Sequence, residues 1–518
     1  MRASLFVASL VSWAVLCSAS RISVTGVDDF EAESRLGKDH LGQHSIWATG
    51  EDGRLGDKEL IRIWRTRGAQ SSDSKSEEGH DVLIARERLE EGHVAQRQDA
   101  QPWDALIRAI LSGEQLSRHP SSGQAVFQSS ATPDLSSLLK QQAAIETITP
   151  SYAIVHVDTT AALLELSTHL PADTRLARLP RWSLPLVDHS SSAAAAAEPA
   201  SKRMFHNPRY IPPLHALLFS PALDIEALRA DARVLTGEDQ DGQVLDDGDG
   251  DGALQHWNSR HSATWGSRTA AAWIRRRMQR DLAAIGGKCN EWTYDEYFAP
   301  NVVCTIPPAK KTPSDEGIVV FSSHLDSRGS FGSTLAPGGN DDGSGTTMLL
   351  ALARHLGQHK IKFEREVRLV AFSGEEQGLV GSQHYAKHLH EQGAKIKLAL
   401  QTDMIGYRKP GEPLQLAFPD KLSTQEATDY IMSIAKIYVP ELTVGYTPAC
   451  CSDHQSFWEQ EFPATWVFER NGPIADDRYH NSGDVTDREG YDFRQIRAST
   501  RVVLASLLDV AGGVEWGW

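Results

Sequence analysis

The sequence predicts an α/β fold with a mixed, largely parallel central sheet and helices on both of its faces. From residue 204 to residue 518, short apolar runs typical of buried strands alternate with segments whose apolar side chains recur at helical spacing. Acidic residues and histidines follow the strand-like runs, and open α/β sheets place their functional sites at that end of their strands. These two observations indicate an α/β domain with a site at one edge of its sheet.

Each predicted element rests on its own pattern. Strands are expected where apolar residues run without interruption, at residues 318–322, 367–372, 396–402 and 465–468. Helices are expected where apolar residues lie three or four apart, at residues 345–356, 382–392, 424–438 and, around Ile496 and Leu507, near the C-terminus. Ser423 and Glu426 have the spacing of a capping box, which predicts that this pair begins the third helix.

The composition is that of a folded protein with an excess of acidic residues. Of the 518 residues, 40% are hydrophobic, and the formal net charge is −16 at pH 7. A hydrophobic content in this range excludes wholesale disorder. A negative net charge disfavours binding to phosphate backbones and anionic lipid surfaces, so we expect no nucleic-acid partner.

The first 20 residues have the pattern of a secretory signal peptide. Arg2 precedes an apolar run at residues 5–15, and small residues follow at positions 17–20. The run is too short to cross a bilayer, which takes about 20 residues, and no hydrophobic tail ends the chain, so no membrane anchor is expected. We expect residues 1–20 to be removed and the protein to be secreted to the extracellular medium or, as an alternative, delivered to a vacuole.

A propeptide is expected between the signal peptide and the α/β domain. Residues 21–187 are polar and weakly periodic, and residues 189–201 form a Ser/Ala-rich segment typical of a linker. The linker ends at the dibasic pair Lys202 and Arg203, which is the kind of site that kexin-like processing proteases cut. We therefore interpret residues 21–203 as a propeptide with its linker and residues 204–518 as the functional domain.

The cysteines indicate an oxidising compartment. Cys289 and Cys304 are plausible disulfide partners, and closing a loop of about 16 residues stabilises a fold by about 3 kcal/mol in a chain-entropy estimate. A bridge between the neighbours Cys450 and Cys451 would be strained. Free thiols and a regulatory vicinal pair both remain open for these two residues.

Several metal-ligand residue types are expected at one edge of the sheet. These residues each lie close to a predicted strand or helix. They are His324 and Asp326, Asp341 and Asp342, Glu375 and Glu376, Asp403, and His480. So many buried carboxylates would repel one another unless cations neutralised them, so a pair of divalent metal ions is the simplest remedy. Nitrogen and oxygen donors without thiolate suit zinc, with manganese or cobalt as substitutes.

Five sequence blocks, in this order, resemble the secreted dizinc aminopeptidases. They are His324-Leu325-Asp326-Ser327, Asn340-Asp341-Asp342-Gly343-Ser344-Gly345, Gly374-Glu375-Glu376, Gln401-Thr402-Asp403-Met404 and Tyr479-His480. The family includes bacterial and fungal leucine aminopeptidases, with aminopeptidase Y and the glutamate carboxypeptidases as wider kin. The resemblance covers residues 210–510 and implies the α/β/α sandwich of zinc peptidases.

The resemblance implies two zinc ions per chain, held by Asp341 between the ions, His324 and Asp403 on one ion, and Glu376 and His480 on the other. It further implies a cis peptide bond between Asp341 and Asp342. Glu375 matches the family's general base, and Asp326 matches the carboxylate that orients the first histidine ligand.

The resemblance also implies a specificity pocket that includes Met404, Trp466, Phe468 and Tyr479. Large apolar side chains favour a hydrophobic first residue such as leucine, so the expected substrates are the N-termini of peptides and proteins. Bacterial relatives carry two cysteines four residues apart near this wall, whereas this chain has Thr447 and Cys451 at that spacing.

Three alternative functions stay open. The fold also supports glutaminyl-cyclase-like acyltransferases that use a single zinc ion, and binding ectodomains that have lost catalysis. A carboxypeptidase or dipeptidase is a third alternative, because the metal centre alone does not decide which end of a peptide is recognised.

Overall fold

A computed structural model of the protein describes two parts of the chain. In the C-terminal part the described residues are 204–243, 256–262, 264–310, 317–330, 332–333, 335–449 and 451–515. In the N-terminal part they are 20–25, 40–49, 59–67, 80–86, 107–108, 110–111, 143–148, 152–170 and 174–178. The expected signal peptide up to residue 19, the linker at 189–201 and the pair Lys202-Arg203 lie outside the described residues.

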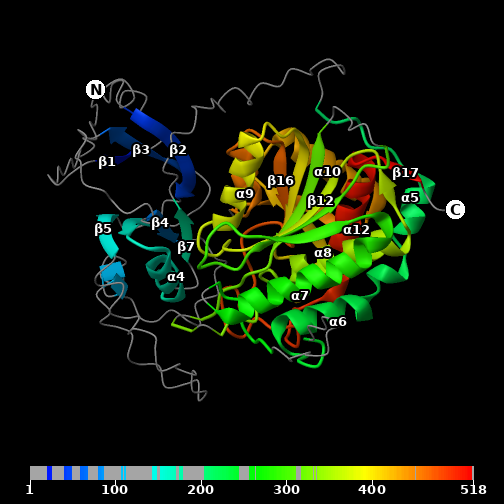
Figure 1. Ribbon diagram of the computed structural model, residues 1–518, viewed down its shortest axis with the longest axis horizontal. Helices are drawn as coiled ribbons and strands as arrows, with labels where there is room; N and C mark the ends of the chain where they lie inside the picture. Colours follow the sequence, from blue (N-terminus) through cyan, green and yellow to red (C-terminus); the bar gives the residue numbers. More distant parts are fainter. Residues whose placement is uncertain are drawn as a thin grey trace, which may run out of the picture.

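A six-stranded mixed sheet forms the centre of the C-terminal part (Figure 1). Its order is β16 (Ala464–Val467), β13 (Ile396–Thr402), β10 (Ile318–His324), β12 (Val367–Phe372), β9 (Asn301–Ile306) and β8 (Lys288–Trp292). The first four strands are parallel, whereas β9 and β8 are antiparallel to their neighbours. The predicted fold class is confirmed, and all four strands expected from the sequence are present.

Helices cover both faces of the sheet. One face carries α6 (Ile225–Thr236), α7 (Trp265–Leu282), α8 (Gly343–Gln358), α10 (Gln425–Tyr438) and α12 (Phe493–Val510), and the other carries α9 (Val380–Glu391) and α11 (His454–Trp458). Strand side chains alternate between the faces: Val319 and Phe321 pack with the first set, and Val320 packs with the second. Burial on both faces is why these strands read as continuous apolar runs.

Short elements complete the domain. They are α5 (Pro212–Leu217), the 3₁₀ turns η5 (Pro221–Leu223) and η6 (Ala283–Ile285), and two small sheets that pair β11 (Lys362–Phe363) with β17 (Gly513–Glu515) and β14 (Gln415–Pro419) with β15 (Thr443–Thr447). Among the described residues, no helix has the length and apolar character that crossing a membrane requires.

The disulfide expected from the sequence joins the two antiparallel strands at one edge of the sheet. Cys289 of β8 is the register partner of Cys304 of β9, and their sulfur atoms are bonded. The bridge therefore closes the outer hairpin of the sheet.

The predicted capping box at the start of α10 is wrong. The N-cap residue is Thr424, and its side chain makes no capping hydrogen bond. The Glu426 carboxylate instead accepts hydrogen bonds from the backbone N–H groups of Met204 and Phe205. The ring of Phe205 also stacks on Tyr430 of the same helix, with centroids 4.7 Å apart. The Glu426 carboxylate, which the local pattern assigned to the cap, thus makes a long-range contact instead.

The N-terminal part contains a second, smaller α/β unit beside the first. An antiparallel sheet in the order β5 (Ala143–Ile148), β6 (Tyr152–Val157), β4 (His80–Arg86) and β7 (Thr174–Arg178) packs with α4 (Thr160–Thr168). A separate sheet joins β1 (Ser20–Thr25), β3 (Glu59–Arg67) and β2 (His40–Thr49). The apolar core of the β4–β7 unit also includes Phe298 and Val380 of the C-terminal part, so the two parts share buried contacts. We call this sheet with α4, residues 80–86 and 143–178 as far as they are described, the N-terminal unit.

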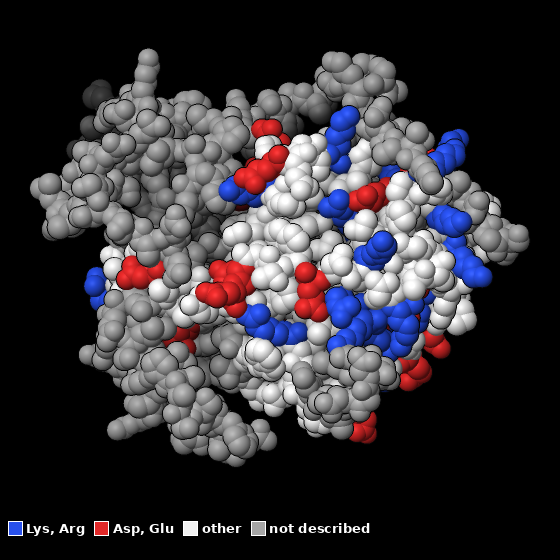
Figure 2. All heavy atoms as spheres, viewed as in Figure 1, with Lys and Arg blue, Asp and Glu red and all other residues white. Residues whose placement is uncertain are grey.

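Basic side chains gather over α7 on the face shown in Figure 2. Three of its arginines pair with nearby carboxylates: Arg275 with Glu291, Arg277 with Asp231 and Arg280 with Asp281. These ion pairs are within the molecule, so the group is explained by contacts inside the fold.

Candidate metal centre and substrate cavity

The residue types expected at one edge of the sheet do meet there. Strand β10 ends in His324, Asp403 directly follows β13, and Glu375 begins the acidic pair just beyond β12. Asp341 precedes α8, and His480 lies on the connection between β16 and α12. Their convergence follows from topology, because the carboxyl ends of parallel strands lie at the same edge of a sheet.

One group of potential metal ligands is formed by His324, Asp341 and Asp403. Nε2 of His324 lies 3.2 Å from Oδ1 of Asp341 and 3.5 Å from Oδ1 of Asp403. Ligand atoms of all three residues lie within 4.8 Å of one another, and all three side chains are buried. One cation could therefore be bound by the three.

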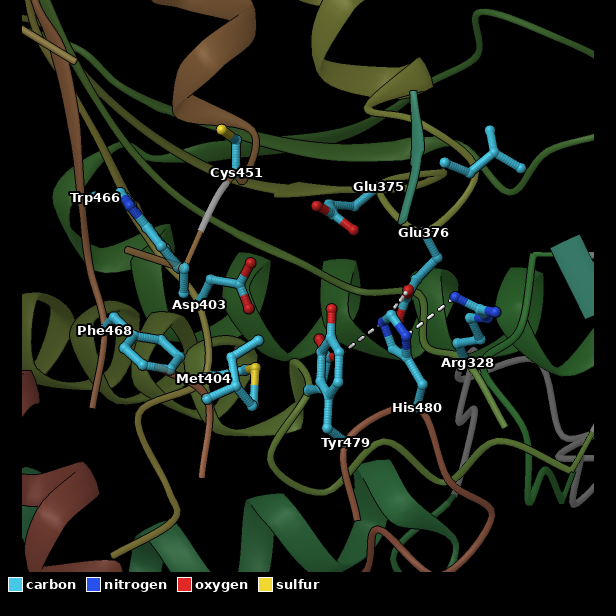
Figure 3. Close-up of a pocket in the computed structure, with 14 residues that line it drawn as sticks. Arg328, Glu375, Glu376, Asp403, Met404, Cys451, Trp466, Phe468, Tyr479 and His480 are labelled. Carbon is cyan, nitrogen blue, oxygen red and sulfur yellow. Dashed lines mark hydrogen bonds and ion pairs between the residues drawn. The ribbon is translucent and has the colours of Figure 1, made fainter. Parts of the chain in front are cut away.

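A second group is formed by Asp341, Glu376 and His480. Nε2 of His480 lies 3.0 Å from Oε2 of Glu376 and 3.5 Å from Oδ2 of Asp341 (Figure 3). Asp341 thus offers Oδ1 to the first group and Oδ2 to the second. The structure brings together all five residues that the sequence nominated as ligands, and the shared carboxylate joins two adjoining three-residue groups.

The donor atoms fit divalent cations. Nε2 of His324 and Oε1 of Glu376 are buried without a hydrogen-bond partner, which is costly unless something else binds them. Burial, and next the charge of Glu376, raise the pKa of Asp341 to about 6. Burial likewise raises the pKa of Glu376 to about 7. Bound cations would offset the cost of keeping both carboxylates charged.

Asp326 contacts both the first histidine ligand and the acidic pair. Nδ1–H of His324 donates to the backbone carbonyl of Asp326 at 3.1 Å, whereas the carboxylate Oδ1 is 3.7 Å from that nitrogen. The Asp326 carboxylate instead accepts hydrogen bonds from the N–H groups of Glu375 and Glu376, at 3.2 and 3.3 Å. It therefore fixes the backbone of the acidic pair more directly than it orients the histidine.

Asp342, which the sequence analysis left without a role, joins three elements of the site. The peptide bond between Asp341 and Asp342 is cis, as the resemblance implied. The Asp342 carboxylate accepts hydrogen bonds from the N–H groups of His324, Gly345 and Met404. A Cβ atom at Gly345 would lie 2.5 Å from that carboxylate, so the close approach of α8 requires glycine. Only the folded chain reveals this role, because the three donors are far apart in sequence.

Asp484 is a second residue that sequence reasoning missed. Its carboxylate accepts hydrogen bonds from the N–H groups of Asn340 and Asp341, at 2.9 to 3.0 Å. Arg488 pairs with Asp484 at 2.8 Å and with Asp476 at 2.6 Å. This buried network supports the backbone that carries the shared carboxylate.

A cavity of about 470 Å³ opens beside the two ligand groups. Its walls include Asp341, Glu375, Glu376, Asp403 and His480 and all four residues nominated for a specificity pocket, namely Met404, Trp466, Phe468 and Tyr479. In Figure 3 the carboxylate of Glu375 is directed into this cavity. The side chains of Met404, Trp466 and Phe468 lie on the side away from Arg328, and Tyr479 stacks on His480; we call these four side chains the apolar wall. The cavity therefore brings carboxylates and apolar side chains together in one place.

Five further residues line the cavity and were not nominated from the sequence, namely Leu176, Arg328, Ala449, Cys451 and Ile474. Cys451 lines the cavity and is disulfide-bonded, whereas Cys450 lies outside the described residues. Arg328 lies on the side opposite to the apolar wall, and its Nη1 lies 3.0 Å from Nδ1 of His480. Leu176 of the N-terminal unit also lines the cavity.

An α/β/α fold with two adjoining carboxylate–histidine groups at the carboxyl edge of its parallel strands has the donor atoms that a metal-dependent enzyme needs. Residues 301–507 match the model of peptidase family M28. This part of the chain carries the peptidase family M28 domain, and the match supports a metallopeptidase.

Known relatives agree with this family. The chain is 28% identical over 271 residues to a probable leucine aminopeptidase of Arthroderma otae, a match that covers 50% of this chain and 70% of the relative. It is 33% identical over 206 residues to leucine aminopeptidase 1 of Sclerotinia sclerotiorum, covering 37% of this chain and 51% of that relative.

Solved structures share the fold. The LapA aminopeptidase of Legionella pneumophila superposes with a TM-score of 0.54 at 16% identity, covering 85% of this chain and 100% of that one. LapB of the same organism gives a TM-score of 0.54 at 16% identity, covering 84% and 100%.

Proposed function

We propose that the protein is a secreted aminopeptidase that uses two zinc ions to remove N-terminal residues, preferably hydrophobic ones, from peptides and proteins. The observation that carries this proposal is the position of Asp341, whose two oxygens face two separate groups of ligands. Leucine aminopeptidases among the relatives supply the class of substrate.

The residues present suit two zinc ions. His324, Asp341 and Asp403 would hold one, and Asp341, Glu376 and His480 would hold the other. Bound zinc would supply Lewis-acid activation of water and of the scissile carbonyl. The chain itself supplies the geometry of the ligands and keeps them buried.

Glu375 is the proposed general base. Its carboxylate lines the cavity, and its backbone is held by Asp326. Glu375 would take a proton from the attacking water as the water oxygen bonds to the carbonyl carbon. It would then deliver that proton to the nitrogen as the C–N bond breaks, which releases the N-terminal residue and a shortened peptide.

The apolar wall is the proposed site for the side chain of the N-terminal residue. Met404, Trp466, Phe468 and Tyr479 belong to one buried apolar cluster with Ile474 and Ala417. Burial of a leucine side chain against such a wall contributes roughly 2 kcal/mol. This supports a preference for hydrophobic residues at the first position.

The base assignment is tested by Glu375→Gln. The variant should lose at least about a hundredfold in kcat on Leu-p-nitroanilide, because proton transfer by a placed carboxylate contributes roughly 10² to 10⁴ in rate. Its zinc content should stay at two per chain by atomic emission. Glu461→Gln, the same change at an exposed residue, is the matched control. Unchanged turnover in the Glu375 variant would refute the assignment.

Metal counting and a blocked substrate separate the alternatives. About one zinc ion per chain would favour a glutaminyl-cyclase-like enzyme, and no turnover of any free peptide would favour a binding ectodomain. Hydrolysis of the N-acetylated substrate as fast as the free one would contradict an aminopeptidase. Secretion, removal of residues 1–20 and cleavage after Arg203 belong to the same proposal, and N-terminal sequencing of the protein from culture medium tests them.

A further inference from the structure

One cation faces the acidic cavity from the side opposite the apolar wall. Arg328 is 3% exposed, and among the described residues that line the cavity it is the only arginine or lysine. Four carboxylates line the same cavity, those of Asp341, Glu375, Glu376 and Asp403. A buried guanidinium in this place offers a fork of donors to any ligand that enters.

The position of Arg328 relative to the ligand groups is fixed by His480. Nη1 of Arg328 lies 3.0 Å from Nδ1 of His480, whose Nε2 faces Glu376 and Asp341 on the other side of the ring. The guanidinium is thus about one imidazole ring away from the second ligand group. Consecutive Cα atoms of a peptide are about 3.8 Å apart, so Arg328 can reach the residue next to a scissile bond held at that group.

Oxygen atoms of the N-terminal unit accept hydrogen bonds from this arginine. Nη2 donates to the carbonyl of Leu170 at 2.5 Å and to Oγ1 of Thr174 at 3.3 Å, while Nη1 donates to the carbonyl of Thr174 at 3.0 Å. The side chain of Leu176 from the same segment lines the cavity. A main-chain segment therefore presents closely spaced oxygens to the guanidinium next to the catalytic groups.

We propose that Arg328 binds the free α-carboxylate of the residue that follows the scissile bond, so that the processed enzyme prefers dipeptides. The oxygens of Leu170 and Thr174 stand where that carboxylate would bind. The apolar wall on the opposite side takes the first side chain, which leaves Arg328 on the leaving-group side. A planar guanidinium matches a carboxylate with two parallel hydrogen bonds. This inference rests on the proposed aminopeptidase function.

The test compares Leu-Gly with Leu-Gly amide, which differ only in the carboxylate. The full chain is cleaved after Arg203 and loaded with zinc, and kcat and KM are measured for both substrates. Wild type should favour Leu-Gly by about tenfold or more in kcat/KM, as charge-assisted hydrogen bonds allow. Arg328→Gln should bring this ratio close to one, mainly through a higher KM for Leu-Gly.

Two further variants sharpen the result. Arg328→Lys keeps the charge but loses the fork, so it should keep only part of the preference. Arg478→Gln makes the same change at an exposed arginine two positions before His480 and should keep the wild-type ratio. A wild-type ratio near one, or equal losses on both substrates in Arg328→Gln, would overturn the proposal, because Arg328 would then only support His480.

A binding measurement separates this inference from the proposed function. The zinc-loaded Glu375→Gln chain is titrated with both dipeptides by calorimetry, with and without Arg328→Gln. Tighter binding of Leu-Gly that depends on Arg328 supports the carboxylate site, and equal affinities refute it, whatever the turnover. Absence of Leu-p-nitroanilide hydrolysis by the processed wild type would instead refute the aminopeptidase.

Discussion

At the scale of single residues, the site depends on carboxylates that hold backbone as well as on those that face the ligand groups. Asp326, Asp342 and Asp484 each accept two or more backbone N–H groups, and each connects segments that are distant in sequence. Such residues hold the ligands in position before any cation arrives. The candidate centre is therefore a property of the folded backbone as much as of its five ligands.

Asp326→Asn should weaken zinc binding by about ten- to a hundredfold, the usual cost of losing a supporting partner. An amide offers one acceptor oxygen, so the N–H of either Glu375 or Glu376 would face an NH₂ group. Competition with a chelator measures the affinity. Ser262→Ala removes only the hydroxyl that donates to Asp326 and should have a smaller effect. Wild-type zinc affinity in Asp326→Asn would contradict this role.

At the scale of elements, α8 combines the site with the core. Asp342 caps its first turn, and near its other end His355 is fully buried with no hydrogen-bond partner on either ring nitrogen. Burial, and next the charge of His359, lower the pKa of His355 to about 3. This histidine is neutral in the fold and becomes charged in acid only when the chain unfolds.

The sign of the pH dependence follows from that difference. An unfolded histidine has a pKa of about 6.5, so the contribution of His355 is fully present above pH 6.5 and is lost as the pH falls towards 3. At pH 5 the loss is about 2 kcal/mol. The free energy of unfolding should therefore fall less between pH 8 and pH 5 in His355→Leu than in wild type.

Urea unfolding at the two pH values, with a chelator present throughout, measures this change. The chelator removes any contribution from metal binding, which also depends on pH. His390→Leu, at an exposed histidine, is the control and should leave the pH dependence as it is. The same pH dependence in His355→Leu and wild type would refute the assignment.

The sequence predicted the elements that are buried on both sides and missed those set by long-range contacts. The strands of the parallel sheet and the helices α8, α9, α10 and α12 follow from apolar periodicity, which burial enforces locally, whereas α6, α7 and α11 were not predicted. The capping role of Glu426 was wrong because Met204 and Phe205, more than 200 residues away, take its carboxylate. His324, Glu376 and Asp403 were nominated as ligands because they follow strands, and Asp341 and His480 were assigned through the family resemblance, whereas Arg328 carried no local signal.

At the scale of the whole molecule, the N-terminal unit forms part of the wall of the cavity beside the candidate metal centre. Besides its contacts with Arg328, Ser167 contacts the ring of His261 at 3.3 Å, and the backbone N–H of Gly332 donates to the carbonyl of Thr168 at 2.7 Å. The weak periodicity of residues 21–187 gave no indication of this packing. These contacts give the predicted propeptide a physical way to block substrate.

We expect the uncleaved chain to be at least about tenfold less active on Leu-p-nitroanilide than the chain cleaved after Arg203, because Leu176 and the oxygens on Arg328 occupy substrate space. A variant with Lys202→Gln and Arg203→Gln should resist cleavage and stay slow. Leu176→Ser should raise the activity of the uncleaved chain. Equal rates before and after cleavage would show that the N-terminal unit does not inhibit.

The anchoring of Met204 and Phe205 on α10 has a consequence for how inhibition would end. A cut just before Met204 leaves the start of the C-terminal part in place, but it converts the contacts of the N-terminal unit from intramolecular to bimolecular. An attached segment faces its site at an effective concentration in the millimolar range, which a severed one loses. Dilution into the surrounding medium would then suffice to unblock the enzyme, so the volume into which the protein is released would set its activity.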